Sequence, residues 1–286
     1  VPPSLDGLPM ARKDLFHRCD HTRGALFATR GCPNRCDFCA IGAMYGSARR
    51  RPVEEVAAEF ASSAGRVIIF WDDNLAGDLA YAKDLFKAIA PHRKWWSSQV
   101  SLHAGMDDEF LDEAARSGCK HLFLGLESVS QPSMVGASKG FNRVEEYAAV
   151  VRIHAHGMAV QAGIVFSFDQ DPPTIFEETL AFLEDAGVQN ATFNILTPYP
   201  GTPLFRRLEA EGRILTRDWR QYNGRNAVVF PPALMSPKEL LAGFRRANAR
   251  FYSLPSIARR LSRARQQLWW TLPLNLAYGL RWRMVG

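Results

Sequence analysis

The sequence predicts an α/β protein that folds as a partial TIM-type (β/α)6 barrel followed by a mainly helical C-terminal extension. Between residues 24 and 215, six short apolar runs rich in β-forming residues alternate with segments of helical periodicity. This alternation is typical of parallel strands joined by right-handed crossovers. Polar residues follow nearly every expected strand, as they do in barrels that gather their chemistry at the C-terminal strand ends.

The expected strands are short, and each runs into polar or turn-forming residues. They are residues 25–30, 66–71, 97–102, 121–126, 160–166 and 191–196. Several of the helical segments between them begin with proline or acidic residues and end at glycine, which suits helix termini. These segments are residues 52–64, 79–90, 107–118, 143–157 and 173–187. Six units are fewer than the eight of a complete barrel, so we expect an incomplete one.

The rhythm of strands and helices stops near residue 216 and divides the chain into three parts. Residues 20–216 form the expected catalytic domain. Residues 217–286 form a helical extension, in which Ser236 and Glu239 make a capping box. The first residues carry neither an initiator Met nor a signal-peptide pattern. We therefore interpret residues 1–19 as a linker within a longer gene product.

Composition and cysteine usage indicate a globular protein of a reducing compartment. A hydrophobic fraction of 47% over 286 residues can fill a large core. The number of cysteines is odd, and three of the five are clustered, which is not typical of a disulfide framework. No run approaches the roughly 20 apolar residues of a membrane-spanning helix. We expect a cytoplasmic protein.

Three cysteines in the stretch "TRGCPNRCDFCAIG" lie on the loop that follows the first expected strand. Cys32, Cys36 and Cys39 have no second cysteine pair at metal-site spacing. Structural zinc takes four closed ligands, whereas three thiolates suit an iron-sulfur cluster that keeps one iron open to another molecule. Cys19 or His21 could supply a fourth zinc ligand, so a zinc-stabilised binding or scaffold fragment is the alternative from another class.

The cysteine spacing, with Phe38 directly before Cys39, resembles the signature of radical S-adenosylmethionine enzymes. The resemblance implies a 4Fe-4S cluster on the three cysteines, with S-adenosylmethionine bound to the open iron. It also implies reductive cleavage to a 5′-deoxyadenosyl radical that abstracts hydrogen from a substrate. An electron donor such as flavodoxin or ferredoxin would then be a partner.

The resemblance further implies cofactor-binding roles for residues near the strand ends. The residues after the second strand lie where the family contacts the methionine amino group, and those after the fourth lie where it contacts the ribose or carboxylate. Residues on the fifth strand and after the sixth lie where it holds the adenine. A turn, a helix cap or core packing is the structural alternative for each. The candidates are Phe38, Asp72, Asp73, Asn74, Glu127, Ser128, Gln161, Val165 and Tyr199.

Longer strings, among them "FWDDNLAGD", "KGFNRVEEY" and "ILTPYPGTPLFRRLEAEGRI", resemble the class that carries a cobalamin domain ahead of the radical domain. The resemblance implies cobalamin-dependent methyl transfer to carbon. This chain contains no Asp-x-His-x-x-Gly string, so cobalamin would be held by a domain or chain outside it. A cobalamin-independent oxidation, cyclisation or rearrangement is the alternative within the family.

The substrate is expected to be a small apolar, planar or lipid-like molecule. Five aromatic residues at or near predicted strand ends suggest it, although such residues often serve packing. They are Trp95, Trp96, Phe166, Phe168 and Tyr199.

The basic character of the chain belongs to its last residues. From residue 240 onward there are nine arginines and no Asp, Glu or Lys, which leaves 26 basic and 29 acidic residues elsewhere. On a helix starting at Ser256, one apolar stripe would hold Ile257, Leu261, Ala264 and Leu268, and tryptophans follow. We expect either peripheral membrane contact through this Arg/Trp-rich tail or packing of the stripe on the barrel. We do not expect nucleic acid, because no recognition fold accompanies the charge.

Overall fold

The computed structural model describes residues 3–12, 24–142 and 148–285, and its central element is a six-stranded parallel sheet. The strands follow the order β1-β4-β5-β6-β7-β8, and every pair in the sheet is parallel. This confirms the predicted partial barrel with C-terminal helices. The strands are β1 (Ala25–Leu26), β4 (Val67–Phe70), β5 (Trp95–Val100), β6 (Cys119–Glu127), β7 (Ala159–Phe166) and β8 (Asn190–Ile195).

The first expected strand is divided in two. β1 pairs with β4, but β2 (Thr29–Arg30) leaves the sheet and pairs antiparallel with β3 (Arg49–Arg50). Between them, the backbone N–H groups of Ala28 and Thr29 donate to the carboxylate of Asp72 instead of to a neighbouring strand. The chain therefore turns away at the point where the cysteine loop begins.

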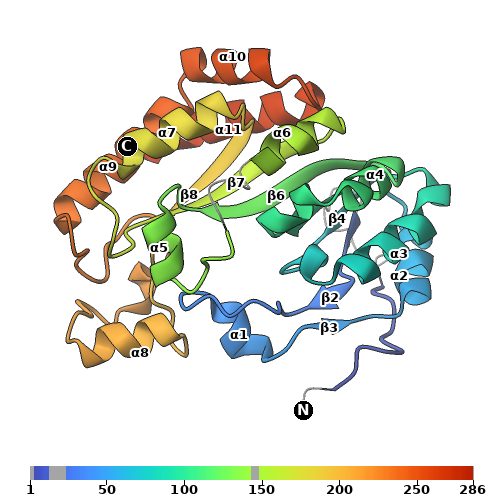
Figure 1. The fold of residues 1–286 in the computed structure, drawn as a ribbon, viewed down its shortest axis with the longest axis horizontal. Helices are drawn as coiled ribbons and strands as arrows, with labels where there is room; N and C mark the ends of the chain where they lie inside the picture. The colour runs from blue at the N-terminus through green and yellow to red at the C-terminus, as the bar shows by residue number, and fades with distance from the viewer. Residues whose placement is uncertain (1–2, 13–23, 143–147, 286) are drawn as a thin grey trace.

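Helices cover the outer face of the sheet, as Figure 1 shows. Those of the barrel are α1 (Ala40–Tyr45), α2 (Val53–Ser62), α3 (Leu79–Ile89), α4 (Asp108–Arg116), α5 (Gln131–Gly136), α6 (Ala148–Ala155), α7 (Ile175–Asp185) and α8 (Pro203–Ala210). Short 3-10 helices are η3 (Leu75–Gly77), η4 (Ala90–His92), η5 (Leu102–Met106) and η7 (Trp219–Gln221). Figure 1 places α1 and α8 at one end of the barrel and α10 at the other.

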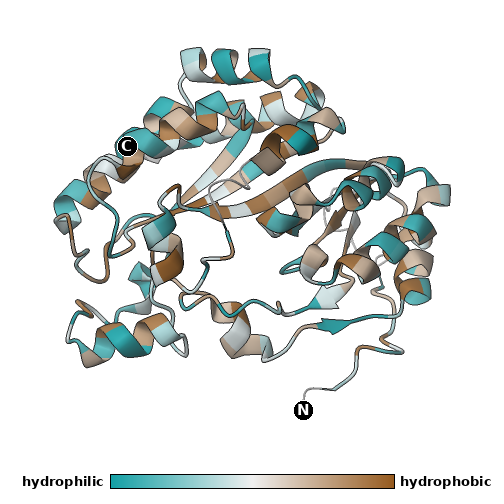
Figure 2. Ribbon diagram, viewed as in Figure 1, coloured by the Kyte–Doolittle hydropathy of each residue, from teal (hydrophilic) through white to brown (hydrophobic). Residues whose placement is uncertain are grey.

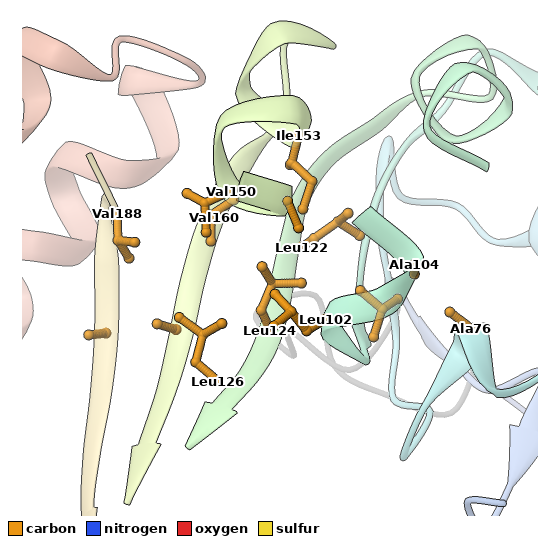
Figure 3. Close-up of a cluster of buried hydrophobic side chains, with 14 of the residues drawn as sticks. Ala76, Leu102, Ala104, Leu122, Leu124, Leu126, Val150, Ile153, Val160 and Val188 are labelled. Carbon is orange, nitrogen blue, oxygen red and sulfur yellow. The ribbon is translucent and has the colours of Figure 1, made fainter. Parts of the chain in front are cut away.

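Strand β6 shows how the sheet separates its two faces. Leu122, Leu124 and Leu126 are fully buried, and Figure 3 shows Leu122 and Leu124 near side chains of α6 and η5. Because side chains alternate along a strand, His121 and Phe123 face the opposite way, into the barrel. The outer face thus forms the hydrophobic core, whose apolar strand residues stand out in Figure 2, and the inner face carries polar side chains.

The C-terminal extension shares this core. It contains α9 (Pro237–Phe251), α10 (Leu254–Arg263) and α11 (Leu268–Val285), and α9 begins with the predicted capping box at Ser236 and Glu239. Phe251 of α9 packs edge-on against Phe193 of β8, with ring centroids 5.3 Å apart. The helices of the extension therefore pack as part of the barrel, while the exact boundary near residue 216 stays a prediction.

The amphipathic stripe of α10 is core. Ile257, Leu261 and Ala264 are buried, which favours packing on the barrel over an exposed docking stripe at this helix. The helix ends at Arg263, so Leu268 belongs to α11. Arg260 corrects the sequence interpretation, because its side chain is fully buried and not on a solvated face.

Two of the aromatic residues expected at the substrate site are also core. Trp96 packs edge-on against Phe70, and the rings of Phe166 and Phe193 stack 5.8 Å apart. Both Trp96 and Phe166 are fully buried on the outer face of the sheet. Within the described ranges, no helix has both the length and the apolar character needed to cross a bilayer.

Candidate functional site

The cysteine loop, residues 31–39, lies at the C-terminal end of the barrel strands. Cys32, Cys36 and Cys39 are half-buried free thiols. The backbone N–H of Cys39 donates to the carbonyl of Cys36 over 3.2 Å, and Asp37 ties the loop to the barrel through its backbone. Its N–H donates to Ala137 and its carbonyl accepts from Leu204. Contacts from two distant segments thus fix the path of the loop.

The donor set fits a cubane cluster better than a single metal ion. The thiols lie near enough for their charges to interact, and burial raises the pKa of Cys36 to about 12. Within the described part of the chain, no three His, Cys, Asp or Glu side chains converge on one ion. Zinc would require such convergence at about 2.3 Å, whereas each cysteine of a cubane binds a different iron. Cys19 and His21, considered as zinc ligands, lie outside the described residues.

Asp72 and Asp73 brace the start of the loop. Asp72 is buried and accepts hydrogen bonds from the backbone N–H of Ala28 and from both the N–H and the hydroxyl of Thr29. Burial raises its pKa to about 6. Asp73 accepts from the N–H of Gly31 over 2.9 Å. The two carboxylates therefore hold the backbone that leads into Cys32, and a contact of either with S-adenosylmethionine stays a prediction.

Asn74 completes this brace. Its amide nitrogen donates to the sulfur of Cys32 over 3.6 Å, and its carbonyl oxygen accepts from the backbone N–H of Ser101. Asn74 is itself buried, with about 4% of its surface exposed. A buried amide that donates to a cysteine sulfur stabilises negative charge on that sulfur, which suits a metal-bound thiolate.

Glu127 forms a buried ion pair that sequence reasoning missed. It lies at a β-bulge with φ of 66°, an unusual value for a residue other than glycine. The carboxylate of Glu127 accepts from Lys139 Nζ over 2.6 Å, and Lys139 also donates to the carbonyl of Gly125. Lys139 lowers the pKa of Cys36, opposing the effect of burial. Lys139 is thus a buried cation next to the cysteine loop. No local sequence pattern indicates this position, which becomes evident only in the folded structure.

The other predicted residues lie at four different locations. Phe38 and Val165 join one apolar cluster, where Phe38 packs edge-on against Phe168 with centroids 5.7 Å apart. Ser128 is buried, and its hydroxyl accepts from the N–H of Ser130, as in a turn. Tyr199 is largely exposed, and its carbonyl accepts from the hydroxyl of Thr202. Gln161 lies deeper, in the barrel interior.

Comparison with protein families identifies the catalytic fold. The model of the radical SAM superfamily matches residues 26–170. The chain belongs to the radical SAM superfamily. Membership implies a 4Fe-4S cluster and S-adenosylmethionine as cofactors. A second model, a domain of unknown function (DUF4070), matches residues 202–273.

Two curated relatives are named as methyl-transferring enzymes. The chain is 31% identical to bacteriochlorophyllide d C-12(1)-methyltransferase of Chlorobaculum tepidum, over 82% of this chain and 53% of that protein. It is 27% identical to the hopanoid C-2 methylase of Rhodopseudomonas palustris, over 75% of this chain and 43% of that protein. The chain therefore spans about half the length of these relatives or less.

Solved structures share the fold at low sequence identity. The radical S-adenosylmethionine methyltransferase TsrM from Kitasatospora setae, with cobalamin and a [4Fe-4S] cluster bound, aligns with a TM-score of 0.61 at 19% identity. The alignment covers 77% of this chain and 46% of TsrM. The cobalamin-dependent S-adenosylmethionine radical enzyme OxsB aligns with a TM-score of 0.58 at 15% identity, over 80% of this chain and 40% of OxsB.

Proposed function

We propose that this chain is the radical domain of a cobalamin-dependent methyltransferase that acts on a carbon atom of a small apolar substrate. The observation that carries the proposal is the cysteine loop, because two of its three thiols, Cys36 and Cys39, lie near Lys139 at the mouth of the barrel. The methyl-transferring activities for which the two curated relatives are named, and the cobalamin in the TsrM and OxsB structures, support the methyl transfer.

The protein's own residues hold and orient the reacting groups. Cys32, Cys36 and Cys39 would bind three irons, and Lys139 would compensate the negative charge that collects on the sulfurs. When bound, the cluster and S-adenosylmethionine would supply a radical that abstracts hydrogen from an unactivated carbon. Cobalamin would come from a domain or chain outside these residues, and a flavodoxin or ferredoxin would supply the electrons.

Reductive cleavage of S-adenosylmethionine tests this proposal. We expect the anaerobically reconstituted chain, reduced with dithionite, to release 5′-deoxyadenosine slowly even without its substrate, as measured by liquid chromatography. Added methylcobalamin with a matching substrate should direct the methyl group to carbon. Full cluster loading without cleavage would contradict the radical function. Cleavage that converts substrate without cobalamin would favour oxidation, cyclisation or rearrangement.

We also propose that α11 contacts the surface of an anionic membrane. Trp269, Leu272, Leu276 and Leu280 are exposed large apolar residues spaced three or four apart, so they share one face of the helix. The tail contains arginines and no acidic residue, which complements anionic lipid. Three of its arginines already form ion pairs with acidic residues of α7. We therefore expect the apolar face to contribute most of the binding to the membrane.

Flotation with anionic liposomes tests the membrane proposal. We expect the chain to float with the vesicles at low salt. The pair Leu276→Asp and Leu280→Asp should reduce the bound fraction about tenfold, because two exposed leucines that would enter the lipid surface become charged. Val151→Asp is the matched control, since Val151 is an exposed apolar residue of another helix, α6. A chain that stays unbound at low salt, or a control that is equally impaired, would contradict the proposal.

A further inference from the structure

The barrel contains a cavity of about 490 Å³ that is partly open to solvent, within the size range of small-molecule sites. Its walls come from the inner faces of β4, β5, β6 and β7 and from one face of α11. Trp270 and Leu274 line the α11 side, and Phe123 lies on β6. The last helix of the extension thus supplies one wall of the cavity.

Three polar side chains on neighbouring strands line this cavity without a partner. Ser97, His121 and Gln161 are each more than nine-tenths buried. Ser97 and His121 are paired in register across β5 and β6, and Gln161 lies on β7 in register with Phe123. No hydrogen bond joins these side chains to another residue in the described ranges, and among their polar atoms only Nε2 of His121 is both fully buried and unpaired.

Leaving the Nε2 atom of His121 unpaired is costly. A fully buried polar group without a hydrogen bond destabilises a protein, and native structures leave few such groups. The indole nitrogen of Trp270, whose ring lies 6.4 Å from that of His121, is a further unpaired group at the same wall. Such a cluster is expected where a bound molecule provides the partners.

The charges of the cavity restrict what it can bind. Its lining contains no Lys or Arg, and its charged side chains are Asp72 and Asp73. Burial lowers the pKa of His121 to about 4, so the imidazole is neutral at pH 7. An anionic group would therefore lack a cation to pair with, and it would face carboxylates. A neutral hydroxyl, carbonyl or amide fits Ser97, His121 and Gln161.

The cavity also has a defined direction. Asp73 lines it and at the same time accepts from the N–H of Gly31, next to Cys32. A ligand anchored by its polar group on His121 would extend its apolar part toward the cysteine loop. The reacting carbon would then belong to the apolar part of the molecule.

We propose that this cavity binds the substrate through a neutral hydrogen-bonding group held by Ser97, His121 and Gln161. The α11 face with Trp270 and Leu274 forms the opposite apolar wall and selects the shape of the substrate. This inference rests on the proposed function for the identity of the ligand as substrate, but the site itself rests on the cavity and its polar groups.

A matched pair of probes tests the site without cluster or S-adenosylmethionine. 2-Naphthol carries one neutral hydroxyl on a planar apolar body, and naphthalene is the same body without it. The full chain is labelled with 5-fluorotryptophan, and Trp270→Phe identifies the fluorine resonance of Trp270. We expect 2-naphthol to shift this resonance and to bind about tenfold more tightly than naphthalene, the effect of about one hydrogen bond.

Variants separate recognition from folding. His121→Leu and Gln161→Leu should each raise the Kd of 2-naphthol about fivefold to tenfold. The Kd of naphthalene should stay within about twofold of the wild-type value, because only the hydrogen bonds are lost. The controls are His92→Leu and Trp219→Phe, since both residues are exposed and neither lines the cavity. They should change neither Kd. Circular dichroism melts confirm that each variant is folded.

The outcomes are distinguishable from those of the cleavage assay. If both probes bind wild type and His121→Leu equally, or if Trp270 does not respond while other tryptophans do, the substrate site is overturned, whatever the enzyme does with S-adenosylmethionine. If His121→Leu and Gln161→Leu weaken the binding of 2-naphthol but not that of naphthalene, and no 5′-deoxyadenosine forms, the binding site stands and the proposed function fails.

Discussion

Cys36→Ala is expected to abolish cluster retention and to reduce the release of 5′-deoxyadenosine more than about 100-fold. Replacing residues that only support metal ligands costs about 10–100-fold, so loss of a ligand itself should cost more. Two remaining cysteines would leave two irons of a cubane without protein sulfur. The measurements are iron and sulfide content after anaerobic reconstitution, and the amount of 5′-deoxyadenosine under dithionite.

Cys119→Ala is the control for Cys36→Ala. Cys119 is also a free, buried cysteine, but it lies at the start of β6 and its thiol faces the carbonyl of His121. We expect its loss to leave iron content near four per chain and cleavage unchanged. Wild-type iron and cleavage in Cys36→Ala would contradict the cysteine-loop assignment, and equal losses in both variants would indicate a general effect on folding.

Most of the barrel was predictable because its signals are local. Alternating apolar runs of strand length and helices with proper termini specify the six β/α units within short windows. The cysteine loop was predictable for the same reason, since Cys32, Cys36 and Cys39 lie within eight residues of one another. The sequence alone therefore identified the catalytic fold and its expected metal ligands.

The remaining features depend on contacts between distant segments. The first strand breaks because Asp72 accepts hydrogen bonds from the backbone N–H groups of Ala28 and Thr29, which precede it by 44 and 43 positions in the sequence. Lys139 reaches Glu127 because a bulge and a positive φ turn the carboxylate toward it. Such pairings leave no periodic trace in the sequence. Asp72, Asp73 and Asn74 were predicted to contact S-adenosylmethionine, which stays a prediction, and the hydrogen bonds they make to the loop could not be predicted from the sequence.

Arg260 illustrates the limit of hydropathy patterns most clearly. A pattern counts arginine as a surface residue, yet this guanidinium lies 3.6 Å from the ring centroid of Phe251 with no exposed surface. It donates to the carbonyls of Val188, Gln189 and Phe251 and to the side chain of Asn275. Main-chain oxygens at the start of β8 therefore replace water around the charge.

We expect Arg260→Ala to lower the free energy of unfolding by about 3–5 kcal/mol, because it leaves several buried acceptors unpaired and a cavity in their midst. The melting temperature should fall by about 6–15 °C for a chain of this size. Arg259→Ala is the matched control. Arg259 is exposed and forms a 2.7 Å ion pair with Glu184, so its loss should cost less than about 1 kcal/mol.

The effect of Arg260→Ala should also reach the barrel cavity. Arg260 donates to Asn275, and Asn275 in turn donates to the carbonyl of Gln189, so the two residues fasten α11 to the start of β8. Below its melting temperature, Arg260→Ala should therefore broaden or shift the fluorine resonance of Trp270. It should also weaken the binding of both 2-naphthol and naphthalene, since the whole α11 wall moves. His121→Leu, in contrast, should weaken only 2-naphthol. The contrary result would be an Arg260→Ala protein whose free energy of unfolding lies within about 1 kcal/mol of that of Arg259→Ala and that keeps the wild-type Trp270 resonance. It would show that apolar contacts alone hold α11 in place.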